Sequence, residues 1–231
     1  MLEPDNRVVM VSGASRGIGR AIVERLLGTG FRVSAGVRDA RGLTASDRLQ
    51  VHRYDAESAE SAASWVAATL ARFGALHALV NVAGINSFAA LDDPDESRLD
   101  ALWAINVKAP MRLIRLALPH LAASGCGRVV NVASLSGKRV RNANIGYAMT
   151  KFALVALTHG VRHAGWEQGV RATALCPGYV ATDMTAEVTG FPRARMSDPL
   201  DIALLTETVL RLSDTASIAE LLVNCQNEDM L

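Results

Sequence analysis

The sequence has few cysteines, few aromatic residues and no long apolar run. Its 231 residues include three cysteines and 5% aromatic residues. Widely spaced cysteines in an odd number do not suggest a disulfide framework, so we expect a reducing, cytoplasmic location. The first apolar run, 8–12, is too short for a secretory core or a membrane span, and we expect no membrane partner.

A strong charge of either sign is also missing. The chain carries 24 basic and 23 acidic residues, for a net charge of +1. This balance provides no basic surface for nucleic acid. Among the five histidines, only His159 and His163 have helical spacing, and no cysteine or carboxylate close in sequence completes a metal site. We therefore expect a small-molecule partner and no metal.

What the sequence does contain is an alternation of short β-branched runs with longer segments of helical period. This pattern is typical of an α/β fold with a parallel sheet. We predict a single doubly wound Rossmann-type domain over 1–231, with helices on both faces of a seven-stranded sheet in the order 3-2-1-4-5-6-7. The predicted strands are Arg7–Ser12, Arg32–Val37, Leu49–Tyr54, Ala78–Asn81, Arg128–Ala133, Arg171–Cys176 and Glu220–Cys225.

Two long helices are predicted in the second half of the chain. One covers Leu99–Leu121, where Pro110 is expected to start a segment and Pro119 to kink it. The other covers Ile145–Trp166. No linker, repeat or low-complexity tract indicates a second domain.

A glycine-rich turn follows the first predicted strand. Residues 12–19 read SGASRGIG and lead into a helix. Glycines at such a turn let the backbone approach a pyrophosphate, and the helix N-terminus supplies unpaired amides to hold it. The turn therefore predicts a dinucleotide cofactor.

The end of the second strand bears on the choice between NAD and NADP. Val37 stands where an acid would bind the ribose of NAD, and Arg38 follows it. Arg38 and Arg16 could together bind the extra phosphate of NADP, which favours NADP over the simpler interpretation of two surface arginines. Asp39 would favour NAD if it turned inward, so NAD stays possible.

Tyr147 and Lys151 lie four residues apart, one turn along the same helix face. A nearby ammonium and an oxidised nicotinamide would stabilise the phenolate and lower its pKa, which would make Tyr147 a proton shuttle. Ser134, at the carboxyl end of the fifth strand, could hold a substrate oxygen beside the phenol. The alternatives are a chance Tyr/Lys pair and an ordinary turn serine.

Together these residues resemble the classical short-chain dehydrogenase/reductase family over nearly the whole chain. The resemblance extends to Asp55-Ala56, to 81–84 (NVAG), to Asn106 and to 177–182 (PGYVAT). It implies Tyr147 as acid/base, Lys151 as pKa modifier and ribose anchor, and Ser134 as donor to the substrate oxygen. Asn106 would organise a relay water, and Thr182 with the Val180 backbone would contact the nicotinamide amide.

The resemblance also implies a cofactor site and a homodimer or homotetramer. Departures are Ser12 for threonine, Val82 for asparagine, and a segment 222–228 without the paired glycine often found there. The expected cofactor-binding residues are Gly13, Ser15, Arg16, Gly17, Ile18, Gly19, Arg38, Asp55, Ala56, Asn81, Ala83, Gly84, Tyr147, Lys151, Pro177, Gly178, Val180 and Thr182.

The expected function is hydride transfer between NADP(H) and a small carbonyl compound or secondary alcohol. The alternative is a non-catalytic NADP(H)-binding sensor or scaffold subunit. The segment Met184–Ser197 is short for a substrate lid, which predicts a rather open pocket. Lys138, Arg139 and Arg141 could select an anionic substrate, although a solvated basic loop is the favoured interpretation.

Overall fold

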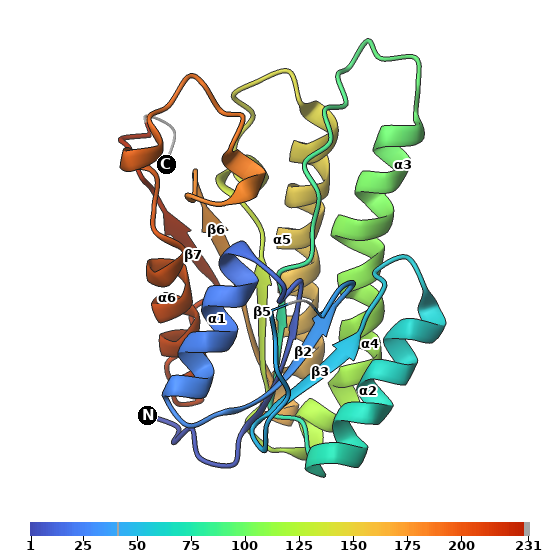
Figure 1. The fold of residues 1–231 in the computed structure, drawn as a ribbon, viewed down its shortest axis with the longest axis vertical. Coiled ribbons are helices and arrows are strands. Elements are labelled where there is room, and N and C mark those ends of the chain that lie inside the picture. Colours follow the sequence, from blue (N-terminus) through green and yellow to red (C-terminus); the bar gives the residue numbers. More distant parts are fainter. Residues whose placement is uncertain (41, 229–231) are drawn as a thin grey trace.

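The computed structural model describes residues 1–40 and 42–228. One seven-stranded parallel sheet runs through it in the order β3-β2-β1-β4-β5-β6-β7, which confirms the predicted α/β domain and strand order (Figure 1). The strands are β1 (Val8–Ser12), β2 (Arg32–Val37), β3 (Leu49–Arg53), β4 (Ala78–Asn81), β5 (Arg128–Val132), β6 (Arg171–Pro177) and β7 (Glu220–Val223).

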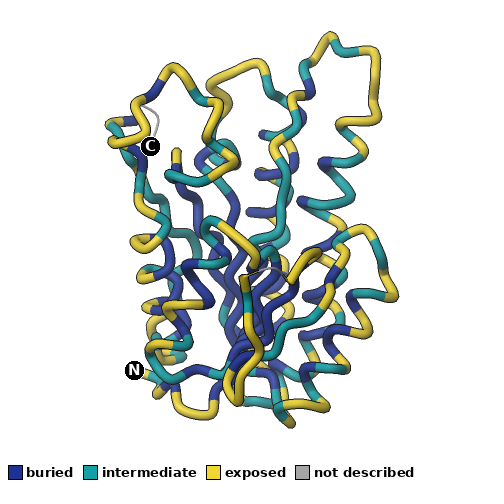
Figure 2. The backbone as a smooth tube through the Cα atoms, in the orientation of Figure 1, coloured by how far each residue is buried: buried dark blue, intermediate teal, exposed yellow. Residues whose placement is uncertain are grey.

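Helices cover both faces of the sheet. On one face α1 (Gly17–Gly28) packs against α6 (Pro199–Arg211), and on the other α2 (Ala59–Phe73) packs against α4 (Ala109–Ala123), beside α5 (Ile145–Gly165). Each layer encloses its own apolar core. The central strands β1, β4 and β5 are buried along their whole length, as expected for parallel strands covered on both sides (Figure 2).

The prediction of one helix over Leu99–Leu121 is wrong in detail. The chain forms α3 (Ser97–Trp103), a π-helical turn over Ala104–Lys108, and then α4. The wider π turn interrupts the α-helical hydrogen bonds before Pro110, which does stand in the first turn of α4 as expected, while Pro119 lies inside it. The other predicted helix is confirmed as α5.

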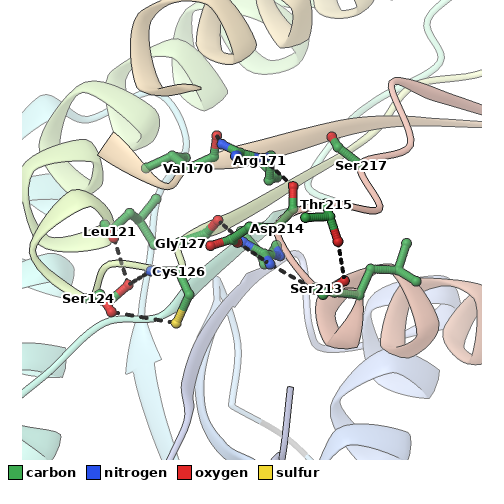
Figure 3. Close-up of polar contacts among 12 residues, drawn as sticks. Leu121, Ser124, Cys126, Gly127, Val170, Arg171, Ser213, Asp214, Thr215 and Ser217 are labelled. Carbon is green, nitrogen blue, oxygen red and sulfur yellow. Dashed lines mark hydrogen bonds and ion pairs between the residues drawn. The ribbon is translucent and has the colours of Figure 1, made fainter. Parts of the chain in front are cut away.

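Arginine contacts close the amino end of the sheet. Arg128 is 2% exposed and donates to the Leu212 carbonyl at 2.7 Å and to Asp214 Oδ1 at 2.8 Å. Arg171 Nε donates to the Asp214 carbonyl at 3.1 Å, and Figure 3 shows these two residues side by side. Arg7 donates to the Cys126 sulfur and carbonyl. Side-chain hydrogen bonds therefore connect the chain segments at this end of the sheet.

Within residues 1–40 and 42–228, no helix is long and apolar enough to cross a membrane. The same ranges hold no group of three or more side chains that could bind a metal ion. His159 does have a carboxylate neighbour, because its Nε2 lies 2.7 Å from Glu220 Oε1 on β7. That partner is distant in sequence, so helix spacing alone did not reveal it.

Candidate active site

A cavity of about 830 Å³ lies at the carboxyl end of the sheet, where turns leave the strands. This edge is where doubly wound sheets bind their ligands. Most of the predicted site residues line the cavity: Gly13, Ser15, Arg16, Gly17, Ile18, Gly19, Arg38, Asp55, Ala56, Ala83, Gly84, Ser134, Tyr147, Lys151, Pro177, Gly178, Val180 and Thr182.

The glycine-rich turn forms a narrow cradle at the start of α1. Gly13 has φ +67°, and a Cβ there would lie 2.7 Å from the Ala83 amide nitrogen, so only glycine fits. No side chain caps the N-terminus of α1, and no acid stands in its first turn. Unpaired amides and a positive helix end thus face the cavity, and they suit the pyrophosphate of a dinucleotide.

Ser12, which stands in place of the more usual threonine, joins β1 to the turn after β4. Its Oγ accepts hydrogen bonds from the amides of Val82 at 3.1 Å and Ala83 at 3.2 Å. Both contacts need only a hydroxyl oxygen. Serine in place of threonine at position 12 therefore keeps the contacts that form this wall of the cavity.

Arginines stand at the end of the cavity near β2. Arg38 is exposed, and Val37 before it is 2% exposed, so no carboxylate occupies that position. Arg16 Nη1 lies 3.2 Å from Asp183 Oδ2, and both side chains are about two-thirds exposed, at 69% and 67%. Such an exposed ion pair is weak, and Arg16 can turn toward an anion at small cost.

Ser134, Tyr147 and Lys151 meet at the other end of the cavity. The ammonium of Lys151 donates to the Val132 carbonyl at 3.0 Å and lies 5.5 Å from the centre of the Tyr147 ring. Ser134 follows β5, and its Oγ accepts from the Ser136 amide at 3.0 Å. The serine therefore has the turn-forming contact of the simpler interpretation as well as its place in the cavity.

The pKa values of this pair move in directions that helix spacing alone did not indicate. Loss of water around the phenol raises the pKa of Tyr147 to about 12, although a hydrogen bond with Ser134 opposes the rise. Burial lowers the pKa of Lys151 to about 8. The lowered phenol pKa expected from Lys151 and an oxidised nicotinamide is thus not a property of the chain alone, because desolvation outweighs the hydrogen bond with Ser134.

Two predicted residues, Asn81 and Asn106, lie behind the cavity wall. Asn106, in the π-helical turn, donates to the Ile85 carbonyl at 3.0 Å and to Thr150 Oγ1 at 3.2 Å, and it accepts from the Ile85 amide at 2.9 Å. Asn81 donates to Asn131 Oδ1 at 2.8 Å. Both amides hold neighbouring segments together, so their side chains shape the site from outside it.

The interpretation of a solvated basic loop is wrong for Lys138 and Arg139, whose side chains are 26% and 10% exposed, whereas the Arg141 side chain is 51% exposed. Lys138 Nζ lies 2.6 Å from Glu220 Oε2. The guanidinium groups of Arg139 and Arg141 both bind the carboxylate of Glu228. Arg139, Arg141 and Glu228 all line the cavity. Since Glu228 is far away in sequence, no local pattern indicated the pairing.

The segment Met184–Ser197 forms part of the cavity wall. One short 3-10 turn, Asp183–Thr185, overlaps its start, and another, Arg193–Arg195, lies within it. The segment lines the cavity with Met184, Val188 and Phe191. The Phe191 ring stacks on Tyr179 at 5.5 Å between centroids. This short segment thus forms an apolar wall.

Comparison with known proteins agrees with this architecture. The short chain dehydrogenase family model matches residues 7–191. The chain is 41% identical over 229 residues to an agropine synthesis reductase of Rhizobium rhizogenes. The aligned region includes 96% of this chain and 53% of that protein. It thus spans about half the length of that relative.

Two further proteins are similar over most of their own length. The 2-(R)-hydroxypropyl-CoM dehydrogenase of Xanthobacter autotrophicus is 35% identical, with 78% of this chain and 77% of that protein covered. A short chain dehydrogenase of Burkholderia cenocepacia J2315, solved in complex with NADP, superposes with a TM-score of 0.86 at 26% identity, over 96% of this chain and 98% of that one. On fold, site and family match together, this chain belongs to the classical short-chain dehydrogenase/reductase family.

Proposed function

We propose that this chain transfers a hydride between NADP(H) and a small carbonyl compound or secondary alcohol. The observation that carries the proposal is one shared cavity, which Ser134, Tyr147 and Lys151 line at one end and the glycine-rich turn and Arg38 at the other. A bound nicotinamide cofactor supplies the hydride chemistry, and the protein supplies placement and the proton. We propose 1–231 as one dinucleotide-binding, catalytic domain.

Each side chain at the catalytic end has a distinct role in this proposal. Tyr147 gives a proton to the carbonyl oxygen during reduction and takes it back during oxidation. Lys151 supplies a positive charge beside the phenol and binds ribose hydroxyls. Ser134 donates a hydrogen bond to the substrate oxygen and keeps it within reach of Tyr147.

Asn106 is proposed to organise a relay water through its backbone. Its side-chain amide already contacts Ile85 and Thr150, as described above. The π-helical turn around it changes the local main-chain hydrogen bonding, a feature frequent at functional sites. The side chain then acts as a positioning group that holds the chain next to Gly84.

NADP is the proposed cofactor, and NAD is the alternative. Support for NADP comes from Arg38 and Arg16, since two guanidiniums match a dianionic phosphate, and from the similar Burkholderia protein solved with NADP. We expect the pyrophosphate at the glycine-rich turn, the adenine near Asp55 and Ala56, and the nicotinamide amide near Val180 and Thr182.

A homodimer or homotetramer in the cytoplasm is proposed as well. Apolar side chains are exposed on α4 and α5, at Met111, Met149 and Phe152, and on α6, at Leu200 and Leu204. Exposed apolar side chains on both faces of the domain are candidate contacts between subunits. Light scattering after size exclusion measures the assembly directly, and a monomer at micromolar concentration would contradict it.

The proposed function is tested by a substrate screen with both reduced cofactors. Purified protein is mixed with NADPH or NADH and a panel of aldehydes, ketones and oxo acids, and nicotinamide absorbance is followed over time. We expect turnover with NADPH on part of the panel. Tight NADPH binding without turnover on any carbonyl or alcohol would overturn the proposal and favour the sensor or scaffold subunit.

A further inference from the structure

Three charged side chains form a cluster beyond Ser134, at the end of the cavity away from the glycine-rich turn. Arg139 donates from Nε and Nη2 to the two carboxylate oxygens of Glu228, both at 3.1 Å. Arg141 Nη1 donates to Glu228 Oε2 at 2.9 Å. Gln226 adds a fourth contact, from Nε2 to Glu228 Oε1 at 3.3 Å. The Glu228 carboxylate is thus held from several directions.

The charges of this cluster do not cancel. The Glu228 side chain is 4% exposed and that of Arg139 10%, whereas Arg141 is 51% exposed. Burial alone would raise the pKa of Glu228, but hydrogen bonds from Arg139, Gln226 and Arg141 outweigh burial and lower the pKa, so the carboxylate is ionised. Two guanidiniums then face one carboxylate, and one positive charge is left over.

Within residues 1–40 and 42–228, the surrounding wall supplies no further carboxylate to balance that charge. Lys138 is paired with Glu220, and Arg16 with Asp183. The remaining acids of the cavity lining, Asp55 and Glu57, follow β3 at the proposed adenine end. The cavity lining also contains amide, hydroxyl and apolar side chains, among them Asn86, Phe88, Ser136, Asn142, Asn144, Met184, Val188 and Phe191.

We propose that Arg139 and Arg141 form an anion-binding site for the substrate, which is therefore a carbonyl compound that also carries a carboxylate. The inference rests on the proposed function and extends it to a substrate class. Arg141 is the recognition residue, because half of its side chain is exposed while one nitrogen is anchored by Glu228. Arg139 and Glu228 position it. A guanidinium fork matches a carboxylate in shape and charge.

The test uses pairs of substrates that differ only in charge. We compare 4-carboxybenzaldehyde with 4-carbamoylbenzaldehyde, and succinate semialdehyde with its amide, by kcat/KM with NADPH. Charge-assisted hydrogen bonds predict about a tenfold or greater preference for each carboxylate. In Arg141→Met this ratio falls about tenfold or more, mainly through KM. In Glu228→Gln the ratio rises, since the internal counter-charge is gone.

Arg48→Met is the matched control, because Arg48 is exposed before β3 at the opposite end of the sheet. It removes the same charge and should keep the wild-type ratio. A ratio near one in the wild type, or an unchanged ratio in Arg141→Met, would overturn the inference while the proposed function stands.

A second measurement separates the two proposals if no aldehyde is turned over. Thermal shifts of the NADPH complex are recorded with 4-hydroxymethylbenzoate and with 4-hydroxymethylbenzamide. A shift for the benzoate alone, lost in Arg141→Met, would support the anion site even though the proposed reaction had failed. Equal shifts for both compounds in both proteins would overturn the anion site.

Discussion

The Lys151 ammonium lies 5.5 Å from the centre of the Tyr147 ring, one turn along α5. The pKa of Tyr147 is raised to about 12 and that of Lys151 is lowered to about 8. At pH 7 the phenol therefore keeps its proton and the lysine is charged. This is the protonation state that reduction of a carbonyl group requires, because the phenol must donate its proton.

Replacement of Tyr147 tests the proton transfer. In Tyr147→Phe we expect kcat to fall about 10²- to 10⁴-fold, the range ascribed to general acid–base catalysis, since the ring stays but its proton is lost. The dissociation constant for NADPH, from fluorescence titration, should stay within a factor of about three, which also shows that the variant is folded. Near-normal turnover would remove Tyr147 from the mechanism.

The lowered pKa of Lys151 predicts a pH dependence. Lys151 is protonated below its pKa of about 8 and neutral above it, so the charge that stabilises the phenolate disappears as the pH rises. We expect kcat/KM for carbonyl reduction to decline with a midpoint near pH 8. Lys138→Arg serves as the control and should keep this midpoint. A flat profile from pH 6 to 10 would contradict the assignment.

Arg38 is expected to select the phosphate of NADP. Arg38→Ala should weaken NADPH binding by about tenfold to a hundredfold, because a charge-assisted contact is lost, and NADH binding should change little. Dissociation constants for both cofactors provide the measurement. Arg48→Ala is the control for a lost positive charge. An NADPH preference that survives in Arg38→Ala would assign the selection to other residues.

The arginine contacts at the amino end of the sheet are expected to stabilise the folded protein. Asp214→Ala leaves the guanidinium of Arg128, which is 2% exposed, without its carboxylate. The Leu212 and Gly127 carbonyls still accept from it, so we expect a loss of about 1–3 kcal/mol in the free energy of unfolding.

Urea denaturation measures this loss. Asp92→Ala, at an exposed position, should change the free energy of unfolding by less than about 0.5 kcal/mol. Equal stability of the two variants would show that Asp214 does not stabilise the buried arginine.

Much of the fold followed from local pattern. Parallel strands buried on both faces are continuous apolar runs, as in 8–12 and 78–81, so the strands stood out from the amphipathic helices between them. The π-helical turn at Ala104–Lys108 did not stand out. Its residues have helical periodicity, and the extra residue in the turn leaves no mark on composition.

The sequence by itself determined which residues stand at strand ends and helix turns, and that sufficed to bring the glycine-rich turn, Ser134, Tyr147 and Lys151 to one edge of the sheet. Only the tertiary structure decided the chemistry that depends on burial and distant neighbours. Loss of water set the direction of both pKa shifts. Glu228 reached Arg139 from the far end of the described chain. Desolvation and long-range ion pairs exist only once the chain has folded, so no local pattern encodes them.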